Sequence, residues 1–167
     1  MIIRENYIRN ILPFMNKPVI KVITGIRRSG KSTFLKMLRE KLIKDGINER
    51  NFVFINKDSL QFDFIKNYND LNNFVLKSFR RIKGKKYLFV DEIQEIEQWE
   101  KAIAGFLADN VADLYITGSN SRLLSSELAT LISGRYIEFP MYTLVFSEFL
   151  NFRKIKNSNE YENEFNL

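Results

Sequence analysis

The residues best placed to do chemistry form one short run of glycine, hydroxyl and basic side chains. Residues 25–32 read GIRRSGKS and satisfy the pattern G-x-x-x-x-G-K-[ST]. They follow a β-branched run and precede a run with helical spacing, which is the context that this pattern requires. Glycines let the backbone curl so that N–H groups and a helix N-terminus point at phosphate oxygens. The run therefore predicts a site for the phosphates of a nucleotide.

Individual side chains of this loop have distinct expected roles. Lys31 neutralises the β and γ phosphates, and the Ser32 hydroxyl coordinates Mg²⁺, a hard ion that prefers oxygen ligands. Thr33 assists near the α-phosphate. The residues expected to bind the nucleotide are Gly25, Ile26, Arg27, Arg28, Ser29, Gly30, Lys31, Ser32 and Thr33. A turn followed by a helix cap would explain the glycines but would leave Lys31 unexplained.

An acidic pair follows a short apolar strand further along the chain. Residues 87–92 read YLFVDE and resemble a Walker B element. In such an element Asp91 holds Mg²⁺ through water, and Glu92 orients and deprotonates the attacking water. A switch-type GTPase would usually show Asp-x-x-Gly here and Asn-Lys-x-Asp later, and the sequence has neither. The alternative is two acids at a solvent-exposed strand end.

Composition removes several other kinds of chemistry. The 167 residues include no cysteine and no histidine, which excludes disulfides, thiolate or imidazole metal sites and a Ser-His-Asp triad. The 45% hydrophobic and 28% charged content is typical of one globular domain with a buried core. No run approaches the roughly 18 apolar residues of a membrane span, and the first ten residues carry charges. We expect a cytoplasmic protein without membrane contact.

Apolar periodicity supplies the elements that must position these motifs. Expected strands cover residues 19–24, 51–56, 87–90, 114–117 and 136–139, and expected helices cover 31–44, 71–82, 99–107 and 124–132. Short apolar strands alternating with helices predict an α/β fold in which helices cover both faces of a mainly parallel sheet. Residues 1–18 should form a leading amphipathic helix and 19–150 the main domain. The polar residues 151–167 would be a linker or the start of a further region.

Four segments together carry a family resemblance. GIRRSGKST, YLFVDEIQEIEQWEKAI, ITGSNSRLL and LISGRYIEF resemble the prokaryotic AAA-domain P-loop ATPases, whose longer members carry a C-terminal domain of unknown function. The resemblance covers roughly residues 19–150 and implies ATP and Mg²⁺ as cofactors and a sheet order of 5-1-4-3-2. It places Ser119 or Asn120 at the position that senses the γ-phosphate or the attacking water. A turn that caps the next helix would explain these two residues equally well.

The same resemblance gives Arg135 the place of an arginine finger. Such a residue would point at the nucleotide of a neighbouring subunit, which implies a homo-oligomer. The alternative is a surface ion pair between Arg135 and Glu138. The chain also stops before the helical lid of the family, so we expect it to bind ATP better than it hydrolyses it.

Charge is distributed unevenly along the chain. Residues 1–86 carry a net charge of +13 and residues 87–167 a net charge of −7. The basic segment, residues 77–86, contains Lys77, Arg80, Arg81, Lys83, Lys85 and Lys86 and no acid. It could be a nucleic-acid contact or the solvated face of a helix. An acidic patch is expected from Asp91, Glu92, Glu95, Glu97 and Glu100, and contact between unlike patches could build a ring or filament.

These observations favour a Mg²⁺-dependent ATPase domain that uses ATP hydrolysis to change its conformation or its contacts with a partner. A small-molecule or nucleoside kinase is the alternative, with Arg122 and Arg135 as its only support. A third hypothesis is a nucleotide-gated interaction module with little turnover. Free phosphate, a phosphorylated acceptor, or neither product would distinguish the three.

Overall fold

The computed structural model describes residues 5–118, 132 and 134–143, and within them the strands form one parallel sheet. The strands are β1 (Ile20–Thr24), β2 (Phe52–Asn56), β3 (Tyr87–Asp91), β4 (Asp113–Gly118) and β5 (Tyr136–Pro140). Their order is β2-β3-β4-β1-β5, and each neighbouring pair is parallel. This is the expected order 5-1-4-3-2 counted from the other side, so the expectation is confirmed.

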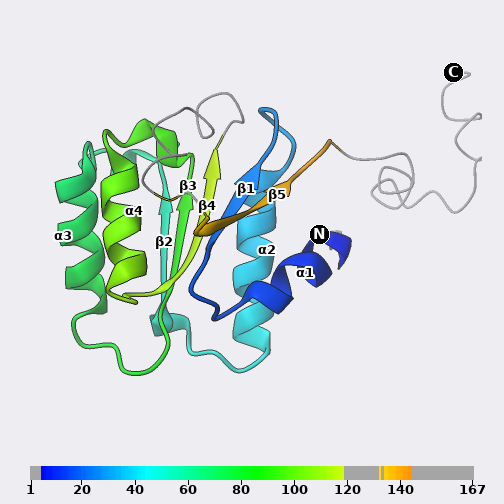
Figure 1. The fold of residues 1–167 in the computed structure, drawn as a ribbon, viewed down its shortest axis with the longest axis horizontal. Coiled ribbons are helices and arrows are strands. Elements are labelled where there is room, and N and C mark those ends of the chain that lie inside the picture. Colours follow the sequence, from blue (N-terminus) through cyan, green and yellow to red (C-terminus); the bar gives the residue numbers. More distant parts are fainter. Residues whose placement is uncertain (1–4, 119–131, 133, 144–167) are drawn as a thin grey trace, which may run out of the picture.

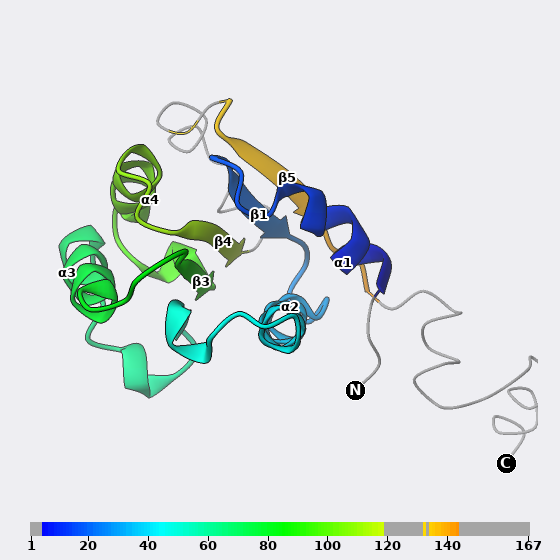
Figure 2. The same ribbon diagram turned by 90° about the horizontal axis from the view of Figure 1, so that it is seen from below.

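Helices cover both faces of the sheet and make three layers (Figure 1). The helices are α1 (Glu5–Ile11), α2 (Lys31–Lys44), α3 (Tyr68–Phe79) and α4 (Trp99–Ala108). The end-on view of Figure 2 shows α3 and α4 side by side on one face and α2 on the other. Parallel strands need such crossover connections, which explains the alternation of strand and helix in the sequence.

Side chains that alternate along the strands build two cores. Val22 of β1 and Ile116 of β4 pack in the core that includes α3 and α4. Their neighbours Ile23 and Tyr115 pack in the core that includes α1 and α2. Because a strand buries both of its faces, its sequence reads as a continuous apolar run instead of an alternating one.

Short 3-10 helices complete the connections. They are η1 (Leu12–Phe14), η2 (Glu49–Asn51), η3 (Leu60–Phe62) and η4 (Ile93–Glu95). No helix in the described part of the chain is long and apolar enough to cross a membrane. Since all the strands run in one direction, their carboxyl ends meet at one edge of the sheet and their amino ends at the opposite edge.

One helix begins and ends earlier in the sequence than we predicted. The periodicity predicted a helix over residues 71–82, but α3 spans Tyr68–Phe79. A capping box begins the helix early, because the Asn67 side chain accepts from the backbone of Asp70 while the Asp70 side chain accepts from the backbone of Asn67. The fourth expected helix (124–132, of which only residue 132 is described) and residues 151–167 lie outside the described residues.

Candidate functional site

The glycine loop joins β1 to α2 at the carboxyl edge of the sheet. Gly25 has φ +153°, and a Cβ on it would lie 2.3 Å from the carbonyl oxygen of Met141, so only glycine fits there. Gly30 precedes α2 with φ +94°, in the left-handed region that favours glycine. The helix begins at Lys31, and its first N–H groups have no partners within the helix. The loop therefore presents a helix N-terminus suited to an anion.

Lys31 connects this loop to the acidic pair. Its side chain is 3% exposed, and its Nζ donates to the carbonyl oxygens of Gly25 (3.1 Å) and Ile26 (3.2 Å). The same Nζ lies 3.5 Å from Oε1 of Glu92. Residues far apart in the sequence thus meet around one ammonium group.

Asp91 at the end of β3 is completely buried. Its Oδ1 accepts a hydrogen bond of 2.5 Å from the Thr117 hydroxyl, whereas its Oδ2 has no hydrogen-bond partner within the described part of the chain. Burial raises the pKa of Asp91 above that of a free aspartate, and the nearby hydroxyls of Thr117 and Ser32 partly oppose this. The Ser32 hydroxyl lies near Asp91. A buried carboxylate oxygen without a donor is therefore available beside Ser32.

Glu92 is turned away from the strand by its backbone. It has φ +54° and ψ +52°, a left-handed conformation that non-glycine residues rarely adopt outside functional or tightly constrained sites. Its backbone N–H donates to the Thr117 hydroxyl at 3.0 Å, and its Oε2 accepts from Gln94 Nε2 at 2.6 Å. The side chain remains 19% exposed, so its carboxylate is held in place while still reaching solvent.

A cavity of about 830 Å³ lies over these groups. Its volume falls in the usual range of small-molecule sites. The lining residues are Arg27, Arg28, Gly30, Lys31, Ser32, Thr33, Asp58, Glu92, Gln94 and Glu95. Most residues predicted from the glycine loop thus share one cavity with Glu92, and Asp91 lies buried close to Ser32.

Sequence reasoning missed three residues of this site. Thr117 ends an expected strand and was assigned no role there, although its hydroxyl is hydrogen-bonded to both members of the acidic pair. Gln94 holds the Glu92 carboxylate, and Asp58 lines the cavity. A polar residue at the carboxyl end of a neighbouring parallel strand was the signal for Thr117 and Asp58, since such ends share one edge.

The remaining predicted residues lie outside the cavity. Ser119 and Asn120 lie outside the described residues. Arg135 precedes β5 at the amino edge, where its carbonyl accepts from the N–H of Ile20 at 2.9 Å. Its side chain is exposed and forms no ion pair among residues 5–118, 132 and 134–143, and Glu138 instead accepts from the Thr24 hydroxyl at 2.6 Å. The ion pair considered as the alternative role of Arg135 is therefore absent from the described structure.

Known sequences resemble this chain over most of its length. A family model described as an AAA domain matches residues 17–150. An uncharacterized protein of Haemophilus influenzae is 39% identical over 95% of this chain and 40% of its own length. An uncharacterized protein of Methanocaldococcus jannaschii is 39% identical over 85% of this chain and 30% of its own length. The chain thus spans less than half of either relative.

Solved structures share the fold at low sequence identity. Saccharomyces cerevisiae RIF2 has a TM-score of 0.60 and 16% identity, covering 93% of this chain and 62% of that one. A DNA polymerase III gamma subunit-related protein of Thermotoga maritima has a TM-score of 0.57 and 17% identity, with coverages of 95% and 51%. Drosophila ORC bound to AT-rich DNA has a TM-score of 0.56 and 13% identity, with coverages of 95% and 61%.

Proposed function

Because the chain belongs to the AAA domain family and folds as an AAA-type P-loop NTPase domain, we propose that it binds ATP with Mg²⁺ and hydrolyses the ATP. The observation that carries this proposal is the meeting of Lys31, Glu92 and the buried Asp91 around one cavity. These three groups match different roles in phosphoryl transfer to water. Lys31 is a cation that can bind phosphate, Glu92 is a carboxylate that reaches solvent, and Asp91 is a buried carboxylate.

The glycine loop would bind the phosphates of ATP. The N–H groups at the start of α2, which have no partners within the helix, and the ammonium group of Lys31 both favour negative charge. Lys31 donates to two carbonyl oxygens of the loop, so its charge is already held where the phosphates would lie. Arg27 and Arg28 line the same cavity and add positive charge at its mouth.

The residues present fit a magnesium ion. Asp91 has a buried oxygen without a hydrogen-bond donor, and Ser32 lies beside it with a hydroxyl. Both are hard oxygen ligands of the kind that Mg²⁺ prefers, directly or through water. When bound, the ion would neutralise phosphate charge during the reaction. Its positive charge would also favour the ionised form of Asp91, which burial alone disfavours.

Glu92 would act as the base for the attacking water. Its carboxylate lines the cavity and is oriented by Gln94, while the Thr117 hydroxyl fixes its backbone. A base must lie within reach of the proton that it removes, and a held but partly exposed carboxylate satisfies that condition. Glu92 would take the water proton as the water oxygen attacks the γ-phosphorus and ADP leaves.

Arg135 would complete catalysis from a second copy of the chain. It lies at the amino edge, opposite the cavity of its own subunit, which supports action between subunits over action within one. An arginine supplied in trans stabilises the charge of the transferred phosphoryl group. We propose a homo-oligomer in which hydrolysis changes conformation or partner contacts.

The products formed from ATP test this proposal against its alternatives. Incubation of the protein with ATP and Mg²⁺ should release free phosphate in a reaction that needs no acceptor. A phosphorylated acceptor would instead establish a kinase. ATP binding with neither product, at any protein concentration, would support a nucleotide-gated interaction module.

A further inference from the structure

The loops that precede β1, β2 and β3 gather positive charge at the amino edge of the sheet. We call this surface the basic edge, and its cations are Lys17, Arg50, Arg80, Arg81, Lys83, Lys85 and Lys86. We propose that the basic edge binds the phosphate backbone of a nucleic acid, on the opposite edge of the sheet from the ATP site. This surface is separate from the ATP cavity, so the inference does not depend on ATP hydrolysis.

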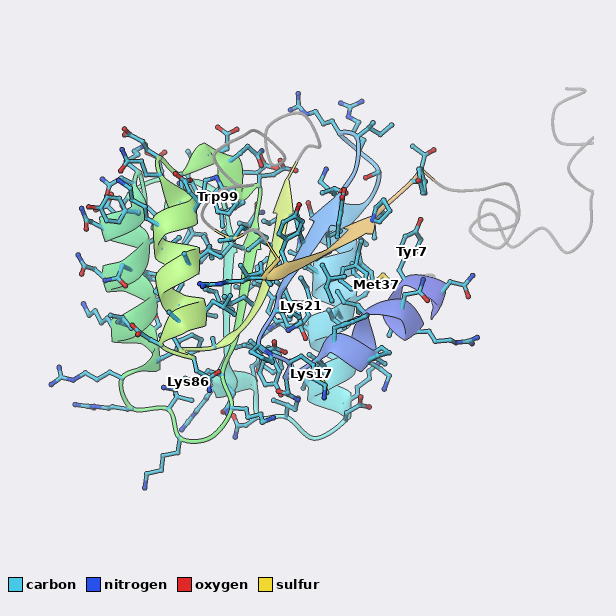
Figure 3. All side chains as sticks on the ribbon, in the orientation of Figure 1. Tyr7, Lys17, Lys21, Met37, Lys86 and Trp99 are labelled. Atoms are coloured by element: carbon cyan, nitrogen blue, oxygen red, sulfur yellow. The ribbon has the colours of Figure 1, made fainter. Side chains whose placement is uncertain are left out.

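The strand order arranges these cations in a row. Arg50 precedes β2, Lys85 and Lys86 precede β3, and Lys17 precedes β1. Neighbouring strands lie about 4.8 Å apart, so the row from β2 to β1 extends over three strand spacings, or about 14 Å. Lys17 and Lys86 both lie at this edge (Figure 3), and with Lys85 they line a cavity of about 300 Å³. Cations from three distant parts of the sequence thus form one surface.

The basic segment is a loop at this edge and not the face of a helix. Helix α3 ends at Phe79, so five of the six cations of the segment follow its last residue. The Asn51 side chain donates to the carbonyl oxygens of Lys83 (3.3 Å) and Lys85 (2.7 Å). The N–H of Asp113 donates to the carbonyl oxygen of Lys86 at 2.8 Å. The backbone of the loop is therefore fixed, which lowers the entropy cost of binding through its side chains.

Most carboxylates near this row form ion pairs with cations that do not belong to the basic edge. Glu49 pairs with Arg39 at 2.5 Å, and Asp45 pairs with Lys41 at 2.6 Å. Asp113, the first residue of β4, pairs with the buried Lys21, and Asp109, in the loop before β4, forms no ion pair among the described residues. Within the described part of the chain, none of the seven cations of the basic edge is ion-paired. The edge therefore carries a strong positive charge that a polyanion would neutralise.

Phosphates in a regular row fit this surface better than two other anionic partners. A membrane surface would favour large, exposed apolar side chains among the cations, whereas Ile82, between Arg81 and Lys83, is half-buried. Among the described residues, the exposed large hydrophobic side chains lie elsewhere, at Ile26, Leu60, Phe64, Leu76 and Tyr142. The acidic patch of a second copy is a weaker match, because its Asp91 is buried and its Glu92 already faces Lys31.

Binding of a fluorescently labelled DNA duplex, followed by anisotropy over a series of salt concentrations, tests the proposal. If about four phosphates are contacted, affinity should fall about 100-fold between roughly 50 and 200 mM salt. The variant Lys83→Glu/Lys85→Glu should bind at least about tenfold more weakly at low salt and show a salt slope flatter by about 1.8. Both side chains are exposed, so the fold should be unaffected.

A matched control separates a local contact from the effect of net charge. The variant Arg9→Glu/Lys36→Glu changes two exposed cations of α1 and α2 by the same total charge, and it should keep most of the affinity. Equal losses in the two variants, or no duplex binding at low salt, would overturn the proposal. So would binding to anionic phosphatidylserine vesicles without binding to the duplex. Sedimentation showing that Lys83→Glu/Lys85→Glu only disrupts self-association, with duplex binding unchanged, would also overturn it.

Discussion

The hydroxyl of Thr117 is bonded to both members of the acidic pair: it donates to Oδ1 of Asp91 at 2.5 Å and accepts from the N–H of Glu92 at 3.0 Å. Thr117 lies on β4, and the pair lies at the end of the neighbouring β3. One side chain therefore sets the position of the buried carboxylate and the backbone turn that places Glu92 in the cavity.

Replacement of Thr117 by valine should reduce turnover more than ATP binding. Valine keeps the shape but leaves the Glu92 N–H unsatisfied, at a cost of about 1–3 kcal/mol in the free energy of unfolding. The phosphate contacts of Lys31 remain, so KM should change less than kcat. Thr117→Ser keeps the hydroxyl and should recover most of the turnover. Equal turnover by the valine variant and the wild type would show that the hydroxyl does not position Glu92.

Asp91→Asn should stabilise the protein at neutral pH when neither nucleotide nor Mg²⁺ is present. Burial raises the pKa of Asp91 in the folded state. The ionised carboxylate therefore destabilises the folded state. This destabilisation is absent at pH values below the pKa of Asp91 in the unfolded chain and is complete above its pKa in the folded protein. Each unit of raised pKa corresponds to about 1.4 kcal/mol. Urea unfolding with EDTA should show an advantage of the variant that is absent at low pH and grows as the pH rises above the pKa of aspartate in the unfolded chain, about 4. A variant that is less stable at neutral pH would contradict this.

Lys21 and Asp113 form a buried ion pair at the amino edge. Burial lowers the pKa of Lys21, although Asp113 opposes this. Lys21→Met should cost about 3–5 kcal/mol in the free energy of unfolding, because it leaves the Asp113 carboxylate buried without a cation. The double variant Lys21→Met/Asp113→Asn should recover much of the loss, since asparagine still accepts the bonds from Asn16 and Tyr115. Equal stability of the single and double variants would contradict the pairing.

Mixing two inactive variants tests the proposed role of Arg135 between subunits. Arg135→Ala would lack the finger, and Lys31→Ala would lack the phosphate contact. Mixed oligomers should regain part of the phosphate release, because some interfaces combine an intact cavity with an intact arginine. The specific activity of the wild type should also rise with protein concentration. No recovery, with mixed oligomers shown to form by crosslinking, would remove Arg135 from catalysis in trans.

The strands, their order and the glycine loop could be predicted because their signals are local or come with the family resemblance. Lys21 within an apolar strand gave no such signal, because its partner Asp113 lies 92 residues away. The role of Thr117 depends in the same way on the register between β3 and β4. The early start of α3 was missed because the apolar period outweighed the capping residues Asn67 and Asp70.

Phosphate release by the wild type and by Glu92→Gln, measured at an ATP concentration that saturates both proteins, is the decisive test of ATP hydrolysis with Glu92 as the base. Glutamine keeps the shape of Glu92 and can still contact Gln94, but it cannot remove a proton from water. We expect calorimetry to detect ATP binding by both proteins, and Lys31→Ala to lose most of this binding. Phosphate release by Glu92→Gln should fall by about 100-fold or more. Undiminished phosphate release by Glu92→Gln would show that Glu92 is not the base for ATP hydrolysis.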